Sequence, residues 1–222
     1  INKGKIMNKL KTMLLTLVTL FAFTNVSNAA SLNGVYLEVG SSAIGADFDG
    51  NHNDDDGDVS KGTLGKTAVT SHYGLGYMTN RSNKVGLDIG YMWYPGEAKV
   101  KATSDNTNTD VTFEISDSTE YYISPMINIT EDASLYFKYA WNESDIKTTG
   151  DVTKLTSMDG ETVALGTVMS WGSNLYIRTE AGMTDYDVIK ATGTDTGTSG
   201  GNSGLSGSVE ADPNMAYGIV TI

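Results

Sequence analysis

The sequence contains no cysteine and no apolar run as long as a membrane-spanning helix. Small exported domains often depend on disulfide bonds, but a chain of this size can bury a core without them. The longest apolar run covers residues 13–23, about half of the roughly 20 residues that a helix needs to cross a bilayer. A disulfide scaffold is therefore excluded, and a helical membrane anchor is disfavoured.

The segment that starts at Met7 has the parts of a secretory signal peptide. Lys9 and Lys11 precede the apolar run, and small residues end the segment, among them Ser27 and Ala29. We expect cleavage after Ala29. Residues 1–29, which include the residues upstream of Met7, would be removed, and residues 30–222 would form one mature domain.

Basic residues are scarce, because 15 lysines and arginines stand against 27 acidic residues, for a net charge of −12. All of the acidic residues follow the expected cut, whereas Lys3, Lys5, Lys9 and Lys11 precede it, so the mature chain is still more acidic. Such a chain has no basic surface with which to neutralise phosphates, and nucleic acid is an improbable partner.

Helical periodicity is also missing from the mature chain, where apolar residues alternate with a period of two. In "VGLDIGYMWY", Val85 to Tyr94, the odd-numbered residues are large and apolar, whereas the even-numbered residues Gly86, Asp88 and Gly90 are small or polar. The same alternation recurs in segments that begin at Val35, Val69, Tyr121, Leu135, Val163 and Leu175, and a last segment reads "MAYGIVTI". The sequence therefore predicts an all-β protein with eight strands.

The connections between these strands alternate in length. Short ones, "NRSNK", "TEDA" and "GSN", suit tight hairpins. Long polar ones cover residues 47–66, 96–118, 143–161 and 185–214. We expect short turns at one end of the molecule and long loops at the other, with both chain ends on the side of the turns.

Alternation alone is compatible with a soluble exported β-sandwich that binds a ligand, which is one alternative. Two observations favour a membrane barrel: the strands are about as long as the roughly 9 to 11 residues that cross a bilayer at a tilt, and aromatic residues gather near the strand ends on the apolar face. Tyr73, Tyr77 and Trp171 would form a belt near the short turns; the belt near the long loops would comprise Tyr91, Trp93, Tyr121, Tyr139 and Trp141.

With its signal peptide, eight strands, alternating turns and loops, and apolar outer face, the chain resembles the small eight-stranded bacterial outer-membrane barrels of the OmpA transmembrane-domain and OmpX type. The resemblance implies an up-and-down antiparallel barrel in the bacterial outer membrane, with short periplasmic turns and long extracellular loops. Members usually end in an aromatic residue, whereas this chain ends at Ile222 after a short closing segment. We therefore expect that a few C-terminal residues are missing; an unusual assembly signal is the alternative.

Strand parity predicts which charged side chains face the barrel interior: Glu38, Asp88, Glu120, Lys138, Arg178 and Glu180. Because unpaired charges in a narrow interior are costly, we expect the two cations to pair with the acids. An eight-stranded barrel is only wide enough for side chains to fill it. We expect a structural plug; a narrow pore gated by exchange of ion-pair partners is the alternative.

Catalysis is not expected. The dipeptide Ser71-His72 offers a nucleophile next to a base, but neighbouring residues of a strand point to opposite faces. His72 is interpreted as a structural residue of the interior.

One dense acidic stretch, "DFDGNHNDDDGD" at residues 47–58, raises the question of a metal site. Aligning Gly57 with the glycine of an EF-hand loop puts His52 at the first position and Thr63 at the twelfth, so that motif fails. A looser calcium cage remains a hypothesis, with oxygens from Asp49, Asn51, Asp54, Asp56 and Asp58. The simpler interpretation is a hydrated acidic loop that interacts with divalent cations at the lipopolysaccharide surface, and no cofactor is expected.

The sequence thus predicts an integral outer-membrane protein with a structural or adhesion-like surface role. Its expected partners are outer-membrane lipid and lipopolysaccharide, the barrel-assembly machinery with periplasmic chaperones, and an extracellular ligand of unknown identity.

Overall fold

The computed structural model describes residues 34–53, 59–79, 84–103, 110–130, 132–149, 153–171, 174–192 and 208–222. The expected signal peptide lies outside these ranges. Within them no helix is both long and apolar enough to span a bilayer. The strands are β1 (Gly34–Asn53), β2 (Val59–Thr79), β3 (Val85–Thr103), β4 (Asp110–Asn128), β5 (Ala133–Thr149), β6 (Ser157–Trp171), β7 (Leu175–Tyr186), β8 (Ile189–Thr192) and β9 (Ser208–Thr221).

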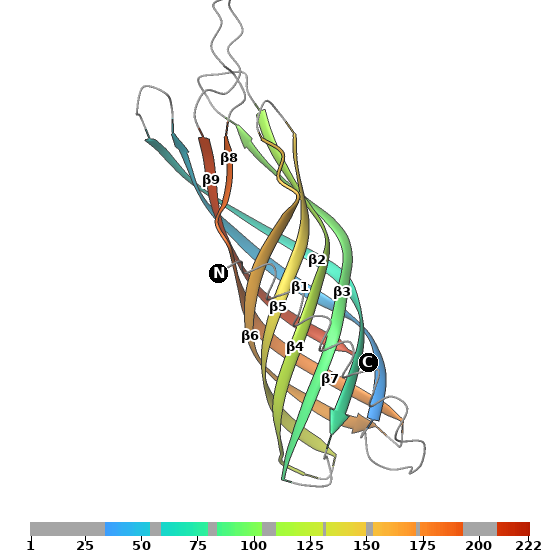
Figure 1. The fold of residues 1–222 in the computed structure, drawn as a ribbon. Helices are drawn as coiled ribbons and strands as arrows, with labels where there is room; N and C mark the ends of the chain where they lie inside the picture. The colour runs from blue at the N-terminus through green and yellow to red at the C-terminus, as the bar shows by residue number, and fades with distance from the viewer. Residues whose placement is uncertain are drawn as a thin grey trace, which may run out of the picture.

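The strands form one antiparallel sheet that closes on itself through pairing of β1 with β9 (Figure 1). Segments β7 and β8 both pair with β9, and only Asp187 and Val188 separate them. Together β7 and β8 occupy one strand position in the barrel wall, so the nine labelled segments form an eight-stranded barrel. Closure excludes the β-sandwich.

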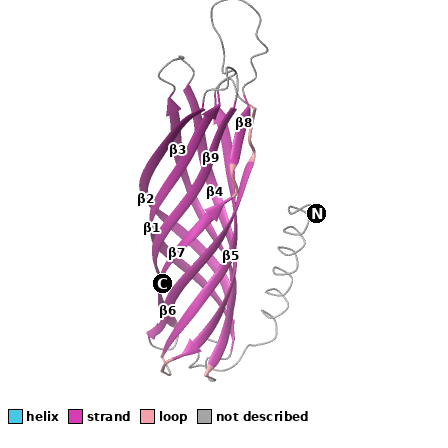
Figure 2. Cartoon of the chain, turned by 90° about the vertical axis from the view of Figure 1, so that its left-hand side faces the viewer, coloured by secondary structure: helices cyan, strands magenta, loops and turns pink. Residues whose placement is uncertain are grey.

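The registers fix the stagger of the barrel. Starting at Leu37, the paired residues lead through Leu75, Tyr91, Tyr121, Trp141, Glu161, Asp185 and Asn214 back to Asp47, which lies ten residues further along β1. A stagger of this size in eight strands gives a strand tilt of roughly 40°. Figure 2 shows the inclined strands, in magenta, winding around the barrel axis.

The alternation of side chains is inverted relative to a soluble protein. Along β5 and β6 every second residue is buried, and the buried set includes Lys138 and Thr162. In the parts of these strands nearer the short turns, exposed apolar residues such as Phe137 and Leu165 lie between the buried ones. Apolar side chains that face outward from a closed barrel are suited to lipid, and polar ones fill the interior.

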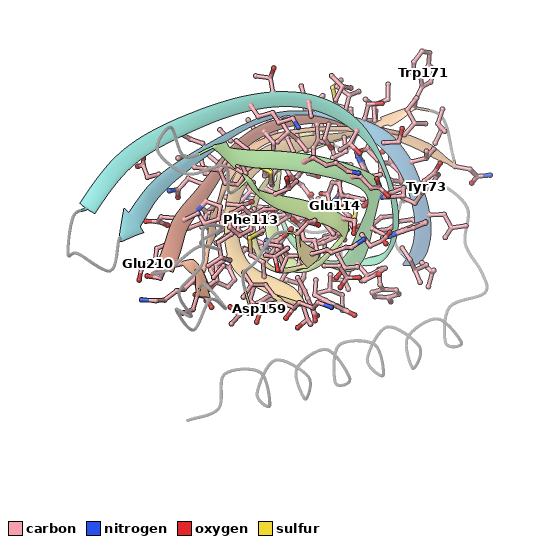
Figure 3. The ribbon with its side chains drawn as sticks, turned by 90° about the horizontal axis from the view of Figure 1, so that it is seen from above. Tyr73, Phe113, Glu114, Asp159, Trp171 and Glu210 are labelled. Atoms are coloured by element: carbon pink, nitrogen blue, oxygen red, sulfur yellow. The ribbon has the colours of Figure 1, made fainter. Side chains whose placement is uncertain are left out.

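The aromatic residues predicted for the two belts all lie on strand positions that face outward, and Figure 3 shows Trp171 projecting away from the barrel wall. Tyr77 differs from the others because it is buried against Ile89 on that face. The assignment of Tyr73 to the belt near the short turns was wrong. Tyr73 pairs directly with Trp93, with 6.0 Å between their ring centroids, so both belong to the belt near the long loops.

Much of the sequence assigned to long loops is strand. The hairpin of β3 and β4 keeps its pairing out to Thr103 and Asp110, and β5 pairs with β6 out to Asp145 and Ser157. Beyond the bilayer neither face of a strand has to be apolar, so the period-two signal fades while main-chain hydrogen bonds continue the ladder. The last strand, too, is longer than expected, because β9 starts at Ser208 rather than near Met215.

These extensions have a small apolar core of their own. Phe113, Ile146, Met158, Ile189 and Ala191 are buried together inside the outer end of the barrel, and Figure 3 shows Phe113 within the ring of strands. The outer end is therefore a packed β-structure rather than a set of separate loops.

Candidate functional site

The candidate site is the polar interior of the barrel, which is built from residues at inward positions of nearly every strand. The structure places Glu38, Asp88, Glu120, Lys138, Arg178 and Glu180 there, each with at most 5% of its surface exposed. Their partners divide them into two groups, which we call the arginine layer and the lysine layer.

The arginine layer spans the interior from β7 to β3 and β1. Arg178 donates from Nη2 to the Asp88 carboxylate at 2.5 Å, and its Nη1 lies 3.7 Å from Glu38 Oε2. Tyr36 donates from its hydroxyl to Asp88 at 2.6 Å, and Tyr176 donates to Glu38 at 3.2 Å. One guanidinium thus serves two carboxylates, and each carboxylate also accepts a phenol hydrogen bond, at Asp88 Oδ1 from Tyr36 and at Glu38 Oε2 from Tyr176.

The lysine layer connects β5 with β4 and β7. Lys138 donates to Glu120 at 2.7 Å and forms a second, shorter ion pair with Glu180. Tyr136 and Tyr217 each donate a hydrogen bond of 2.7 Å to the carboxylate of Glu180. As in the arginine layer, the cation lies between two acids and the phenols complete the coordination of the carboxylate.

Aromatic rings surround both cations. The guanidinium carbon of Arg178 lies 5.1 Å from the ring centroid of Tyr136, and Lys138 Nζ lies 5.5 Å from the ring centroids of both Tyr122 and Tyr217. Cations at this distance from ring faces gain additional electrostatic stabilisation when they are desolvated. The tyrosines are therefore part of the charge-neutralising shell as well as filling volume.

Inward-facing glycines make room for these rings. A Cβ atom added to Gly76 would lie 2.3 Å from the ring of Tyr36, and one added to Gly166 would lie equally close to the ring of Tyr136. The same relation holds for Gly90 with Tyr122 and for Gly182 with Tyr217. Glycine at the inward positions of one strand thus lets a tyrosine from another strand lie flat across it.

His72 belongs to this interior as well and is fully buried. Its ring nitrogens form hydrogen bonds with two hydroxyl groups, Ser42 Oγ at 3.1 Å and Thr221 Oγ1 at 2.8 Å. Ser71 faces the opposite side of β2 and is exposed. The described contacts of His72 are thus structural ones that join β1, β2 and β9 where the barrel closes.

Several interior residues were missed by the sequence analysis. Tyr94 is one of them, and its ring packs beside Met92. Thr162 and Thr184 are two more: the Thr162 hydroxyl accepts a hydrogen bond from Asn142 and forms another with Thr184, both of 2.6 Å. Tyr217 was counted only as part of the closing segment, although its even spacing from Ile219 and Thr221 was the signal that could have placed it inside.

The proposed calcium cage falls mostly on residues whose placement is not described. Asp54, Asp56 and Asp58 lie outside the described ranges, Asn51 is described only by its backbone, and Asp49 is exposed on β1. Among the described residues, no group of three or more potential ligands is arranged to hold a metal ion. The cage therefore stays a hypothesis.

No protein-family model matches the chain, and no curated protein sequence matches it. Among solved structures, the attachment invasion locus protein Ail of Yersinia pestis, in complex with the heparin analogue sucrose octasulfate, is 16% identical with a TM-score of 0.37, over 84% of this chain and 99% of that one. Neisserial surface protein A is 13% identical with a TM-score of 0.37, over 86% and 99%. The outer membrane protease OmpT of Escherichia coli is 11% identical with a TM-score of 0.41, over 89% and 99%.

At these identities and scores, the assignment of the fold rests on the geometry of the chain itself. Eight antiparallel strands close with a stagger of ten residues, the outer face is apolar with aromatic belts, and the inner face is polar and ion-paired. The chain has the fold of a transmembrane outer-membrane β-barrel of the OmpA transmembrane-domain and OmpX type.

Proposed function

We propose that the chain is an integral protein of the bacterial outer membrane with a structural or adhesion-like role, exerted through its acidic extracellular extensions. The observation that carries the proposal is the contrast between the two parts of the barrel. The membrane part is filled by the arginine and lysine layers, whereas the outer part continues as paired, partly exposed strands.

In the described part of the barrel, buried side chains fill the interior at the level of the arginine and lysine layers. Arg178 and Lys138 are inaccessible to solvent, and their carboxylate partners come from four strands, β1, β3, β4 and β7. An eight-stranded barrel is only wide enough for side chains to fill it. The arginine and lysine layers are such a filling, at two positions along the barrel axis. A structural interior leaves the extracellular part as the portion of the molecule that can engage a partner.

The outer extensions are strongly acidic, and we call the following exposed or half-exposed residues the acidic collar. It comprises Asp47, Asp49, Glu97, Glu114, Asp117, Glu143, Asp145, Asp159, Glu161, Asp185, Asp187, Glu210 and Asp212, and Figure 3 marks Asp159 and Glu210 among them. The basic residues of the same region whose side chains are described are Lys66, Lys99, Lys147, Lys154 and Lys190. Such an excess of negative charge favours a partner of basic or cationic chemistry and disfavours nucleic acid.

The expected partners in the membrane follow from the surface. The apolar outer face would contact lipid, and the collar would lie among the headgroups of lipopolysaccharide and their bridging divalent cations. Barrel-assembly machinery and periplasmic chaperones would act before insertion. No enzymatic activity and no cofactor is proposed; the hydrogen bonds of His72 with Ser42 and Thr221 join strands where the barrel closes.

Attachment of cells that display the full chain tests the surface role. In one variant Asp145, Asp159, Asp185 and Asp212 are changed to Asn; in the control, Lys147, Lys154 and Lys190 are changed to Gln. We expect binding to a cationic surface to fall for the first variant, to fall with added salt, and to persist for the control. Equal binding by both variants and by cells without the protein would exclude a role for the collar.

A narrow channel is the second candidate, because each interior cation lies between two carboxylates and could exchange partners. Planar-bilayer recording of the purified barrel separates the two functions. Silence favours the surface role. Conductance steps that vanish in Arg178→Leu would favour the channel.

A further inference from the structure

The ladder between β2 and β3 ends well before the two strands do. Its outermost pair is Tyr73 with Trp93, although β2 reaches out to Val59 and β3 to Thr103. On their other sides both strands stay paired along these outer parts, β2 with β1 and β3 with β4. The outer wall is thus split between the β1–β2 hairpin and β3, which lean apart in Figures 1 and 3. We call this split the seam.

The sequence of β3 explains where the seam begins. Asn128 of β4 donates to the carbonyl of Lys84, so the even-numbered residues of β3 direct their main-chain groups toward β4 and the odd-numbered ones toward β2. Pro95 is the next odd-numbered residue after Trp93, and it has no N–H to donate to β2. A bulge between Tyr94 and Glu97 follows at once and turns the strand.

A cavity of about 410 Å³ lies behind the seam. This volume falls within the roughly 300 to 1,000 Å³ of typical small-molecule sites. Its wall is largely apolar, with Ile44, Phe48, Ile115, Met158, Met215 and Tyr217 as principal members. Since most of the lining is apolar, we expect the larger part of an occupant to be apolar.

The cavity opens sideways as well as outward. Val69 and Ser71 face the outside of the barrel, yet both line the cavity, because the edge of β2 is uncovered there. Val69 is 79% exposed, and Tyr73 and Trp93 of the outer aromatic belt come directly below. The cavity is therefore continuous with the lipid-facing surface at the level of the outer leaflet's headgroups.

The inner end of the cavity is closed. Glu120 and Asn142 line it there, and Glu120 is held by Lys138 of the lysine layer, while Asn142 donates to Thr162 at 2.6 Å. A molecule that entered through the seam would stop at this polar floor. The cavity therefore ends at this floor, and it does not require an opening through the arginine and lysine layers.

One side chain bridges the mouth. Lys66 of β2 donates from Nζ to the carbonyl of Lys99 of β3 at 2.6 Å, where ladder hydrogen bonds are missing. Lys66 is exposed and also lines the cavity. A single exposed contact is easily exchanged for a contact with an anionic group.

We propose that the cavity behind the seam binds a single-chain amphiphile from the outer leaflet, with its apolar tail between the strands and an anionic headgroup at Lys66. This site is separate from the proposed surface role, since its wall is built mainly of inward-facing residues, although Glu97 of the acidic collar also lines it. The anionic group can be a carboxylate or a phosphate, and the experiment distinguishes the two.

The test uses the full barrel in lipid nanodiscs with dodecanoic acid that carries a diazirine at the end of its tail. After illumination, the labelled residues are identified by mass spectrometry of peptides. We expect labels on inward-facing cavity residues such as Ile44, Met158 and Met215. Labels confined to outward-facing residues such as Phe137 and Leu165 would overturn the proposal.

A reversible clamp supplies the matched control. A Cβ atom added to Gly96 lies 3.2 Å from Thr70 Oγ1 across the seam, which is close enough for a disulfide between Thr70→Cys and Gly96→Cys. The chain has no cysteine of its own, so the pair forms no competing bond. Cavity labelling should be lost in the oxidised variant and return on reduction; equal labelling in both states would show that entry does not use the seam.

Two further comparisons test the occupant. Ala46→Trp fills the cavity and should abolish cavity labelling, whereas Ala43→Trp on the outer face of the same strand should not. Competition by unlabelled dodecyl phosphate, dodecanoate and dodecanol identifies the headgroup. Competition by both anions and its loss in Lys66→Gln support the assigned role of Lys66; equal competition by dodecanol would refute it.

Discussion

Arg178 and Asp88 form a hydrogen-bonded ion pair across the barrel, from β7 to β3, and neither side chain is accessible to solvent. The two strands are not neighbours in the sheet. The pair therefore acts as a strut that connects opposite parts of the wall through the interior.

Removing one end of this strut should be costly. Asp88→Asn leaves the Arg178 charge buried with a weaker partner, and we expect the free energy of unfolding to fall by about 3–5 kcal/mol. Urea titration in lipid vesicles, followed by tryptophan fluorescence, measures the change. Glu210→Gln is the control, because its pair with Lys190 is exposed and should contribute less than about 1 kcal/mol. Similar losses for the two variants would contradict a structural role for the arginine layer.

The glycines beneath the tyrosine rings give a second prediction. Gly76→Ala places a methyl group against the ring of Tyr36 and should cost about 1–3 kcal/mol through overpacking. Gly218→Ala is the matched change, since its added Cβ meets no atom closer than 3.9 Å. Both are read out by the same urea titration. If the two substitutions had the same effect, the glycines would not be needed for ring packing.

The outer face predicts a dependence on depth in the membrane. Leu165 is 60% exposed on β6, six residues from the turn-side aromatic Trp171, and Leu165→Arg should cost roughly 2–4 kcal/mol as a charge within the lipid. Leu175 pairs with Trp171 at the edge of the membrane, so Leu175→Arg should cost no more than about 1 kcal/mol. Unfolding in vesicles measures both. If the outer face did not contact lipid, the two substitutions would have similar effects on the free energy of unfolding.

Closure of the sheet should be visible on gels. The barrel should be recovered in the membrane fraction and should migrate differently before and after boiling, because a closed ladder resists unfolding by detergent. A soluble fraction with no change in migration would falsify the membrane assignment.

Calcium offers a last prediction, concerning residues 47–58. If the acidic stretch is simply hydrated, calorimetric titration of calcium into the refolded barrel gives no saturable heat, and changing Asp54 and Asp56 to Asn leaves the trace unchanged. A saturable heat that disappears in this variant would instead establish the cage.

The face of each strand residue could be predicted from the sequence, because a period of two assigns every second residue to one side. That rule was enough to place Lys138 and Arg178 inside. The period of two carries no information on the position of a residue along the barrel axis. That position depends on the register of each strand pair and on the stagger of the closed barrel. The division of four acids between two cations, and the pairing of Tyr73 with Trp93, therefore required the structure.

The outer strands were missed for a different reason. In the segment that follows Glu143, lipid no longer demands an apolar face, and Asp145 and Lys147 give no alternation of polarity. Their order comes from main-chain hydrogen bonds and from contacts such as that of Ile146 with Phe113, which join residues distant in the sequence. Pro95, by contrast, was visible in the sequence, but its effect on β2 depends on which side of β3 lacks the N–H.

The composition of the arginine layer bears on how the barrel enters a membrane. The charges of this layer come from distant strands: Glu38 from β1, Asp88 from β3 and Arg178 from β7. They meet only when the sheet has curled into a closed barrel. A half-curled sheet in lipid would present bare charges to hydrocarbon, at a cost of several kcal/mol for each. We therefore expect the residues that fill the finished barrel to disfavour partial insertion, so that curling of the sheet and crossing of the bilayer occur as one cooperative event.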